Sequence, residues 1–331
     1  MSTERGADVG DYSAPLFLAW QITNRCQARC LTCCEESGPD KAWRDELTRE
    51  ESLKLAQDAV AAGIPYAAFG GGEPLGVKHI WEVLEVLVKG GTELKLETNG
   101  LYIGESQADR LAEWKAQCIQ ISIDGATKKT HETVRPEGDF DGAIASIKRL
   151  VKRGLSPEFV FVPNKLNFKE AAAAYELAAK LGCRTFVTGP MMRLGRAAQG
   201  WNHLALADAV WADTEKALRE KAAALGEPVK LSVYPWDIVT EAQKRLESPQ
   251  AMMLVVPNGK VKLLNALPFA CADLRTHALL EAWELYKKAW KSEEVADFIG
   301  RLDTDPGLLL YANDTWAPGE WLERRKTLTA L

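Results

Sequence analysis

The chain has 331 residues, of which 47% are hydrophobic and 26% charged, and its formal net charge is −5. This composition excludes a disordered tail and a fibrous repeat, and the length suits one large domain with an appendage or two ordinary domains. The mild acidic excess does not suggest a surface that binds nucleic acid. The apolar runs are too short to span a membrane, and the polar N-terminal residues show no signal-peptide pattern, so we expect a cytoplasmic protein.

Short apolar runs alternate with amphipathic stretches over residues 16–226, after an N-terminal tail at 1–15. Strands are predicted at 17–23, 66–69, 93–97, 118–123, 157–162 and 185–189. Helices are predicted from Thr48 onward and at 79–90, 107–114, 140–154, 168–182 and about 204–225. Six strand-then-helix units imply a parallel sheet covered by helices, either an open doubly wound sheet or a barrel.

The unusual residues of the chain all follow predicted strands. They are Cys26 to Cys34, Gly70 to Pro74, Thr98-Asn99-Gly100 and Asp124-Gly125. Because the carboxyl ends of parallel strands meet at one edge of a sheet, we expect these residues to share one site.

Four of the seven cysteines lie within nine positions, at 26, 30, 33 and 34. The spacing of Cys26, Cys30 and Cys33 lets three thiolates converge on one inorganic centre, and the spacing of Cys26, Cys30 and Cys34 is also sterically conceivable. A [4Fe–4S] cluster that only carries electrons takes four cysteines, so three would leave one iron open to a ligand. A zinc knuckle completed by Cys34, or thiols buried in a packed loop, are the alternatives that this spacing leaves open.

The pattern changes after residue 226. The run LSVYPW at 231–236 is followed by a predicted hairpin that turns at Pro257-Asn258-Gly259 and by a predicted helix at 278–290. We expect residues 227–331 to form a small α+β extension that packs against the preceding domain.

Several motifs resemble those of the radical S-adenosylmethionine (SAM) enzymes. The run TNRCQARCLTCCEESGP resembles their CxxxCxxC loop and FGGGEPL their GGEP motif, while ETNG at 97–100, the strand IQISIDGA and Arg135 match one branch of the family. The resemblance covers about residues 15 to 200. It implies an α/β fold in which residues 16–226 form a partial (β/α)6 TIM-like barrel.

The resemblance also implies a site. Cys26, Cys30 and Cys33 would hold one [4Fe–4S] cluster, whose open iron chelates SAM for one-electron cleavage to a 5′-deoxyadenosyl radical. An external one-electron donor such as flavodoxin or ferredoxin would reduce the cluster. The residues expected to contact SAM are Gly70, Gly71, Gly72, Glu73, Thr98, Asn99, Ser122, Asp124, Arg135 and Met191.

Residues 227–331 resemble a SPASM or twitch extension that has lost its auxiliary cluster. Leu264 stands where relatives have a cysteine ligand, and only Cys271 remains in the segment. One thiol cannot hold a cluster, so the resemblance favours a redox-neutral rearrangement, elimination, epimerisation or decarboxylation. Cys271 is interpreted as a small buried side chain, with the alternative that it donates a hydrogen atom to a substrate radical.

The leading functional hypothesis is a radical SAM enzyme that acts on a small biosynthetic intermediate, such as a sugar, a nucleoside or another natural-product precursor. It rests on the 25 residues before Cys26, which are too few for a leader-peptide-binding domain. The first alternative is a peptide-modifying radical SAM enzyme, and the second is an iron–sulfur carrier protein without SAM chemistry. Whether the enzyme is a lyase, an epimerase or an oxidoreductase stays open.

Overall fold

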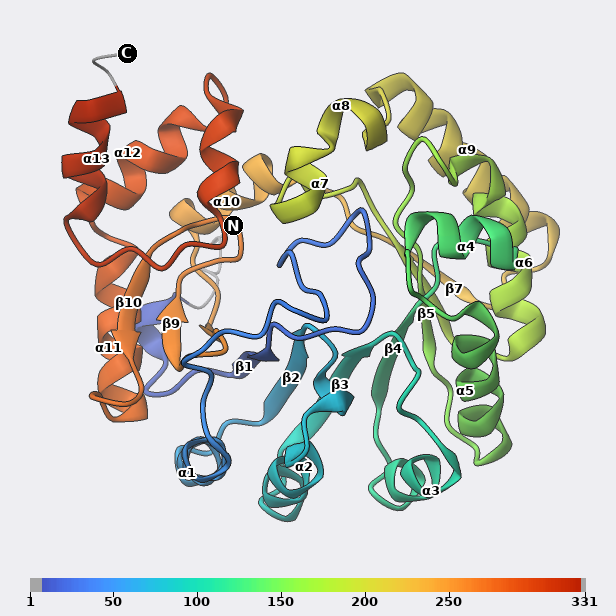
Figure 1. Ribbon diagram of the computed structural model, residues 1–331, viewed down its shortest axis with the longest axis horizontal. Helices are drawn as coiled ribbons and strands as arrows, with labels where there is room; N and C mark the ends of the chain where they lie inside the picture. The colour runs from blue at the N-terminus through green and yellow to red at the C-terminus, as the bar shows by residue number, and fades with distance from the viewer. Residues whose placement is uncertain (1–7, 329–331) are drawn as a thin grey trace, which may run out of the picture.

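A computed structural model describes residues 8–328 (Figure 1). The tail expected at 1–15 lies partly outside the described residues, and its remainder contains the short 3-10 helix η1 (Val9–Asp11). The last three residues of the segment expected at 227–331 lie outside them as well.

One curved sheet organises the molecule. Its ten described strands follow the order β10-β9-β8-β1-β2-β3-β4-β5-β6-β7. Seven of them run parallel and in chain order, namely β1 (Phe17–Thr23), β2 (Tyr66–Gly71), β3 (Glu93–Thr98), β4 (Cys118–Ser122), β5 (Glu158–Val160), β6 (Thr185–Thr188) and β7 (Lys230–Val233). The expected α/β class with a parallel sheet is therefore confirmed.

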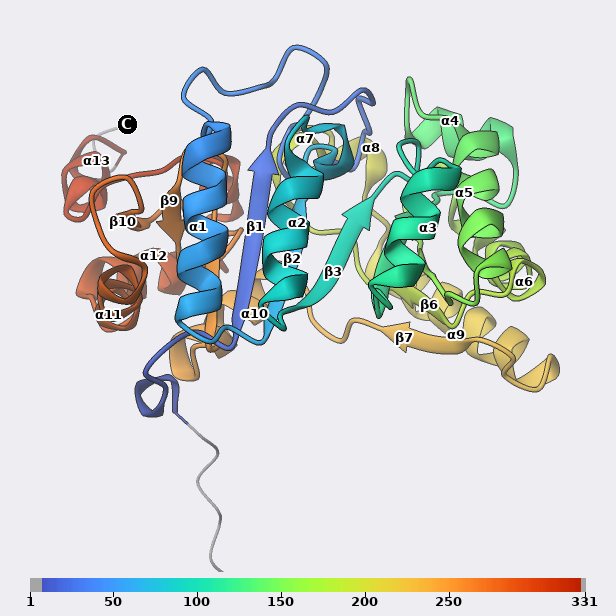
Figure 2. The same ribbon diagram turned by 90° about the horizontal axis from the view of Figure 1, so that it is seen from below.

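Helices cover the outer, convex face of this sheet, and Figure 2 shows the first three beside β1 to β3. The helices that follow successive strands are α1 (Arg49–Ala61), α2 (Ile80–Lys89), α3 (Glu105–Glu113), α5 (Phe140–Lys152), α6 (Ala171–Leu181) and α9 (Asp208–Ala224). The predicted capping box begins α1. The Thr48 side chain accepts a hydrogen bond from the backbone N–H of Glu51, and the Glu51 side chain accepts one from the backbone N–H of Thr48. The helix expected from about residue 204 begins later, at Asp208.

The two faces of the strands differ in burial, because successive side chains of a strand point to opposite faces. Leu18, Phe69 and Leu96 are buried toward the helices, together with the other apolar residues of the main core. Ala19 and Lys95, on the inner face, stay half-buried. The inner face of the curved sheet is thus left partly open, which is where a ligand can lie.

Short helices occupy the loops at the carboxyl ends of the strands. They are α4 (Lys128–Val134), α7 (Gly195–Gln199), α8 (Trp201–Leu204) and the 3-10 helices η2 (Pro74–Gly76) and η3 (Phe168–Glu170). The helix α4 was not predicted from the sequence, because seven residues carry too little periodicity. Its start is fixed by Thr127, whose side chain accepts from the backbone N–H of Thr130.

The segment after residue 226 extends the sheet at both edges. At one edge β7 pairs with β6, and at the other β8 (Met252–Val255) pairs in parallel with β1. The predicted hairpin is confirmed, since β9 (Lys260–Lys262) runs antiparallel to β8. The remaining elements are β10 (Ala270–Asp273), α10 (Ile238–Glu247), α11 (Leu279–Ala289), α12 (Glu293–Arg301), η4 (Pro306–Tyr311) and α13 (Glu320–Leu328). The division of the chain at residue 226 stays a prediction.

No helix within residues 8–328 is both long enough and apolar enough to cross a membrane.

Candidate functional site

The cysteine loop, residues 24–38, follows β1 and lies over the carboxyl ends of the strands (Figure 1). Cys26, Cys30 and Cys33 pack together there, around Ala28, as a small cluster separate from the main core. Cys34 packs against the main core instead. All four are free thiols. The structure therefore separates two cysteines that are adjacent in the sequence.

The sulfur atoms of these three cysteines each accept an N–H group. The donors are Asn99 Nδ2 to Cys26 Sγ (3.8 Å), Arg135 Nη1 to Cys30 Sγ (3.5 Å) and the backbone N–H of Ser37 to Cys33 Sγ (3.3 Å). The thiols of Cys26 and Cys34 also act as donors, toward Gln27 Oε1 at 3.9 Å and toward the Thr32 carbonyl oxygen at 4.0 Å. Hydrogen bonds to ligand sulfurs are among the features that tune an iron–sulfur cluster, so the contacts single out Cys26, Cys30 and Cys33.

The chemistry of this donor set fits a [4Fe–4S] cluster. Burial raises the pKa of Cys26 to about 11 and that of Cys33 to about 12. Thiols of this kind stay protonated until a metal displaces the proton. Among residues 8–328 no three His, Cys, Asp or Glu side chains stand together as ligands of a single metal ion.

The glycine run after β2 is pressed against the cysteine loop. The Gly72 N–H donates to the Thr23 carbonyl at 2.7 Å, and the Glu73 N–H donates to the Arg25 carbonyl at 2.9 Å. A Cβ atom on Gly72 would lie 2.1 Å from the Arg25 oxygen, and Gly71 has a positive φ of 97°. Both positions therefore require glycine.

The Glu73 side chain links the loops that follow β2 and β3. Its carboxylate accepts from the backbone N–H groups of Leu75 (3.1 Å) and Asn99 (2.9 Å) and from Thr98 Oγ1 (2.7 Å). Burial raises the pKa of Glu73 to about 7, against the effect of these donors. Because Glu73 fixes the Asn99 backbone, it also sets the position from which Asn99 reaches Cys26.

Asp124 and Arg135 form a second connection to the cysteine loop. Asp124 is fully buried after β4, where its carboxylate accepts from the Val162 N–H and from Arg135 Nε, both at 2.8 Å. With Nε held in this way, the other end of the guanidinium approaches Cys30. The pair thus positions a positive charge beside a cysteine sulfur.

Two further predicted SAM contacts lie outside this hydrogen-bond network. Ser122 is half-buried at the end of β4. Met191 packs with Ala197 and Leu204 in a small apolar cluster after β6. Their contact with SAM stays a prediction.

Two residues that were not predicted hold the cysteine loop from distant parts of the chain. Arg196, in α7, donates from its backbone N–H to the Cys33 carbonyl (3.0 Å) and from Nε to the Cys30 carbonyl (2.8 Å). Asn313, after η4, donates to the Cys34 carbonyl at 2.8 Å. The position of Arg196 just after the sixth strand was a usable signal, whereas no sequence pattern marks Asn313.

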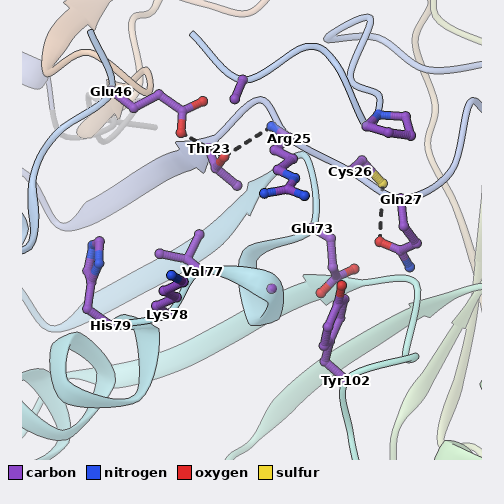
Figure 3. A pocket seen from close by; sticks show the side chains of 13 residues that line it. Thr23, Arg25, Cys26, Gln27, Glu46, Glu73, Val77, Lys78, His79 and Tyr102 are labelled. Carbon is purple, nitrogen blue, oxygen red and sulfur yellow. Dashed lines mark hydrogen bonds between the residues drawn. The ribbon is translucent and has the colours of Figure 1, made fainter. Parts of the chain in front are cut away.

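Two cavities approach the cysteine loop, and they share no lining residue. The outer pocket, of about 530 Å³, reaches Cys26 and Glu73 between the cysteine loop, η2 and the start of α2 (Figure 3). The inner cavity, of about 360 Å³, lies between the inner face of β1 to β3 and α10, and Gly70 and Gly71 line it.

Charged side chains mark the end of the inner cavity that is nearest the cysteine loop. Lys95 Nζ lies 2.7 Å from the Glu97 carboxylate, and Glu35 lines the same cavity. Burial and the charge of Glu97 raise the pKa of Glu35 to about 7. The inner cavity is therefore polar where it meets the glycine run.

Cys271 lies apart from the other candidate residues. It lines a third cavity, of about 350 Å³, between β10, α11 and α12. Its thiol donates to the Val261 carbonyl at 3.3 Å, and burial raises its pKa to about 12. Cys271 does not line the inner cavity, and its part in hydrogen transfer stays a prediction.

Known proteins share both sequence and fold with this chain. A profile of the Radical SAM superfamily matches residues 20–178. The mycofactocin maturase MftC of Mycolicibacterium smegmatis is 29% identical over 202 residues, which make up 61% of this chain and 50% of that protein. The sporulation killing factor maturation protein SkfB of Bacillus subtilis is 28% identical over 59% of this chain and 47% of its own. The chain spans about half the length of these curated relatives.

Among solved structures, SuiB of Streptococcus suis bound to its precursor peptide SuiA has a TM-score of 0.71 at 14% identity, over 85% of this chain and 67% of that chain. At this identity the likeness shows a common fold. SuiB has also been solved with S-adenosylmethionine bound, and members of the superfamily use a [4Fe–4S] cluster and SAM. Residues 20–178 of this chain therefore carry a radical SAM domain.

Proposed function

We propose that this chain is a radical SAM enzyme that modifies a peptide. The observation that carries the proposal is that MftC and SkfB are named as a maturase and a maturation protein, while SuiB, which shares the fold, was solved with a precursor peptide. These relatives support a peptide better than the small biosynthetic intermediate of the leading hypothesis.

The cysteine loop would bind the iron–sulfur cluster that this proposal requires. Cys26, Cys30 and Cys33 would hold the cluster, which with SAM supplies one-electron chemistry and a radical able to abstract a hydrogen atom. The N–H groups of Asn99 and Arg135 that reach the sulfurs would stabilise the negative charge of the ligands. The Gly70-Gly71 backbone lies beside the inner cavity and would let SAM approach closely.

The size of the inner cavity supports the binding of part of a peptide. Ligand pockets of about 300–1,000 Å³ enclose molecules the size of drugs, so a cavity of about 360 Å³ that also admits part of SAM suits a single substrate side chain. We infer that the target residue enters between β1 to β3 and α10 while the rest of the peptide stays outside. The reaction is proposed to be redox-neutral, because Cys271 is the one cysteine after residue 226.

The proposal is tested with the anaerobically reconstituted protein, reduced by dithionite and supplied with SAM. Formation of 5′-deoxyadenosine, measured by mass spectrometry, is expected, and the matched variant Cys33→Ala should form none. A bound cluster without 5′-deoxyadenosine would support the iron–sulfur carrier instead.

The substrate class is tested by isotope transfer. Short peptides encoded beside the gene are synthesised with deuterated side chains, and deuterium is expected in the 5′-deoxyadenosine. The alternative probes are deuterated sugars or nucleosides of the kind that enzymes encoded beside the gene act on. If one of these transfers deuterium and no peptide does, the small-molecule hypothesis is correct.

A further inference from the structure

The outer pocket is a candidate site that the proposed chemistry leaves unused. Cys26 and the buried Glu73 line it, whereas Gly70 and Gly71 line the inner cavity. Figure 3 shows the Arg25 side chain extending into this pocket, between the cysteine loop and η2. A cluster held by Cys26 would therefore border a pocket separate from the cavity proposed for the substrate.

Exposed cations outnumber exposed carboxylates around this pocket, where Asp40 and Asp45 are the exposed acids between lining residues. Arg25 and Lys78 line it and are exposed, as is Lys41 between two lining residues. Within residues 8–328 none of the three side chains forms an ion pair, whereas Arg29 nearby is paired with Asp40 at 2.8 Å. On a chain with a net charge of −5, three unpaired cations beside a cysteine ligand make a local positive patch.

The carboxylates that line the pocket are engaged with the protein. Glu46 accepts from Thr23 Oγ1 (2.8 Å) and from the backbone N–H groups of Asn24 (2.8 Å) and Trp43 (3.0 Å). Glu73 is 2% exposed. An approaching partner thus meets the cations of the pocket before its carboxylates.

Apolar groups complete the wall of the pocket. Val77 and Pro39 line it, and so does the Tyr102 ring, which is 46% exposed. A hollow with an aromatic wall and cations at its rim suits a flat aromatic group that projects from an acidic protein. A flavin whose ring edge is exposed has this shape, whereas a cluster recessed inside a small ferredoxin does not enter a hollow.

We propose that the outer pocket is the docking site of an acidic flavoprotein that delivers single electrons to the cluster. Lys41, Lys78 and Arg25 would contact its carboxylates, and its flavin edge would face Cys26. One electron leaves the reduced flavin and enters the cluster, and no atom or proton has to cross. The site rests on the proposed radical SAM function, and because the two cavities share no lining residue, carrier and substrate can be bound together.

The test uses the reconstituted holoenzyme and reduced flavodoxin as the probe. The double variant Lys41→Glu/Lys78→Glu should weaken flavodoxin binding by at least about tenfold, measured by biolayer interferometry. It should lower the rate of flavodoxin-driven 5′-deoxyadenosine formation by a similar factor. Its dithionite-driven rate should be unchanged, because dithionite needs no docking surface. The control Lys230→Glu reverses an exposed charge at the amino end of β7 and should change neither quantity.

The outcomes separate the two proposals. If dithionite yields no 5′-deoxyadenosine with the wild-type protein, the radical SAM function fails. If dithionite works but the double variant binds flavodoxin as the wild type does, or if ferredoxin binding alone responds to the charge reversal, the docking site is overturned. Raising the NaCl concentration should weaken the wild-type complex more than that of the double variant.

Discussion

At the scale of single residues, the surroundings of each cysteine decide its chemistry. Cys33 and Cys34 are neighbours in the sequence, yet the Cys33 sulfur accepts the Ser37 N–H while the Cys34 thiol packs against the main core. Spacing alone left either residue able to be the third ligand. The packing of the loop supports Cys33.

We therefore expect Cys33→Ala to abolish cluster binding and Cys34→Ala to keep it. Each variant is reconstituted anaerobically, and its iron and sulfide contents and its visible absorbance are compared with those of the wild type. Four irons per chain in Cys34→Ala and close to none in Cys33→Ala are the expected values, since a [4Fe–4S] cluster requires its cysteine ligands. The opposite result would reassign the third ligand to Cys34.

At the scale of secondary-structure elements, the helix α4 ties the end of β4 to the cysteine loop. Its His131 is 2% exposed, and the His131 Nδ1 atom accepts the backbone N–H of Asp124 at 3.2 Å. Arg135 follows at the end of the same helix. The position of the guanidinium beside Cys30 thus depends on a helix of seven residues with a buried histidine.

That histidine makes the stability of the fold depend on pH. Burial, aided by the charge of Arg135, lowers the His131 pKa from 6.5 to about 4. Between these values the unfolded chain binds more protons than the folded one, so the free energy of unfolding falls as the pH drops. From pH 7.5 to 5 we expect the wild type to lose about 2 kcal/mol more than His131→Asn, in urea unfolding of the cluster-free protein followed by tryptophan fluorescence. Equal losses would show that His131 is protonated in the fold.

Much of the element order could be predicted from the sequence, because the strands of a buried parallel sheet are short apolar runs separated by amphipathic helices. The pairing of β8 with β1 could not be predicted, since the two strands are more than 200 residues apart and neither sequence indicates which strand it pairs with. The same holds for the site. The cysteines and glycines carry local motifs, whereas Asn313 acquires its contact only when η4 folds back onto the loop.

At the scale of the whole molecule, the cysteine loop is held by contacts from distant parts of the chain. Arg196 reaches it from the loop after β6, and Asn313 reaches it from the C-terminal segment. Because both residues donate to backbone carbonyls of the loop, they fix its course without depending on a bound cluster. The rigidity of the loop is therefore a property of the complete fold.

Replacing Arg196 by Ala should loosen the loop while leaving the sheet intact. In hydrogen–deuterium exchange of the cluster-free protein, we expect amides of residues 26–38 to exchange about tenfold faster, which corresponds to losing about 1.4 kcal/mol of local stability, while those of β1 to β6 are unchanged. The control Arg219→Ala removes an exposed contact with Glu215 in α9 and should alter neither region. Unchanged exchange over 26–38 would show that Arg196 does not restrain the loop.

The parallel pairing of β1 with both β2 and β8 has a consequence for biosynthesis. When β1 leaves the ribosome its partner β2 follows about 50 residues later, but β8 is some 230 residues away. At about 5–20 residues per second, one edge of β1 waits on the order of ten seconds or more for its neighbour. During that interval the unpaired strand can pair with another nascent chain, so this fold is expected to need chaperones or slow, dilute expression to reach its native state in good yield.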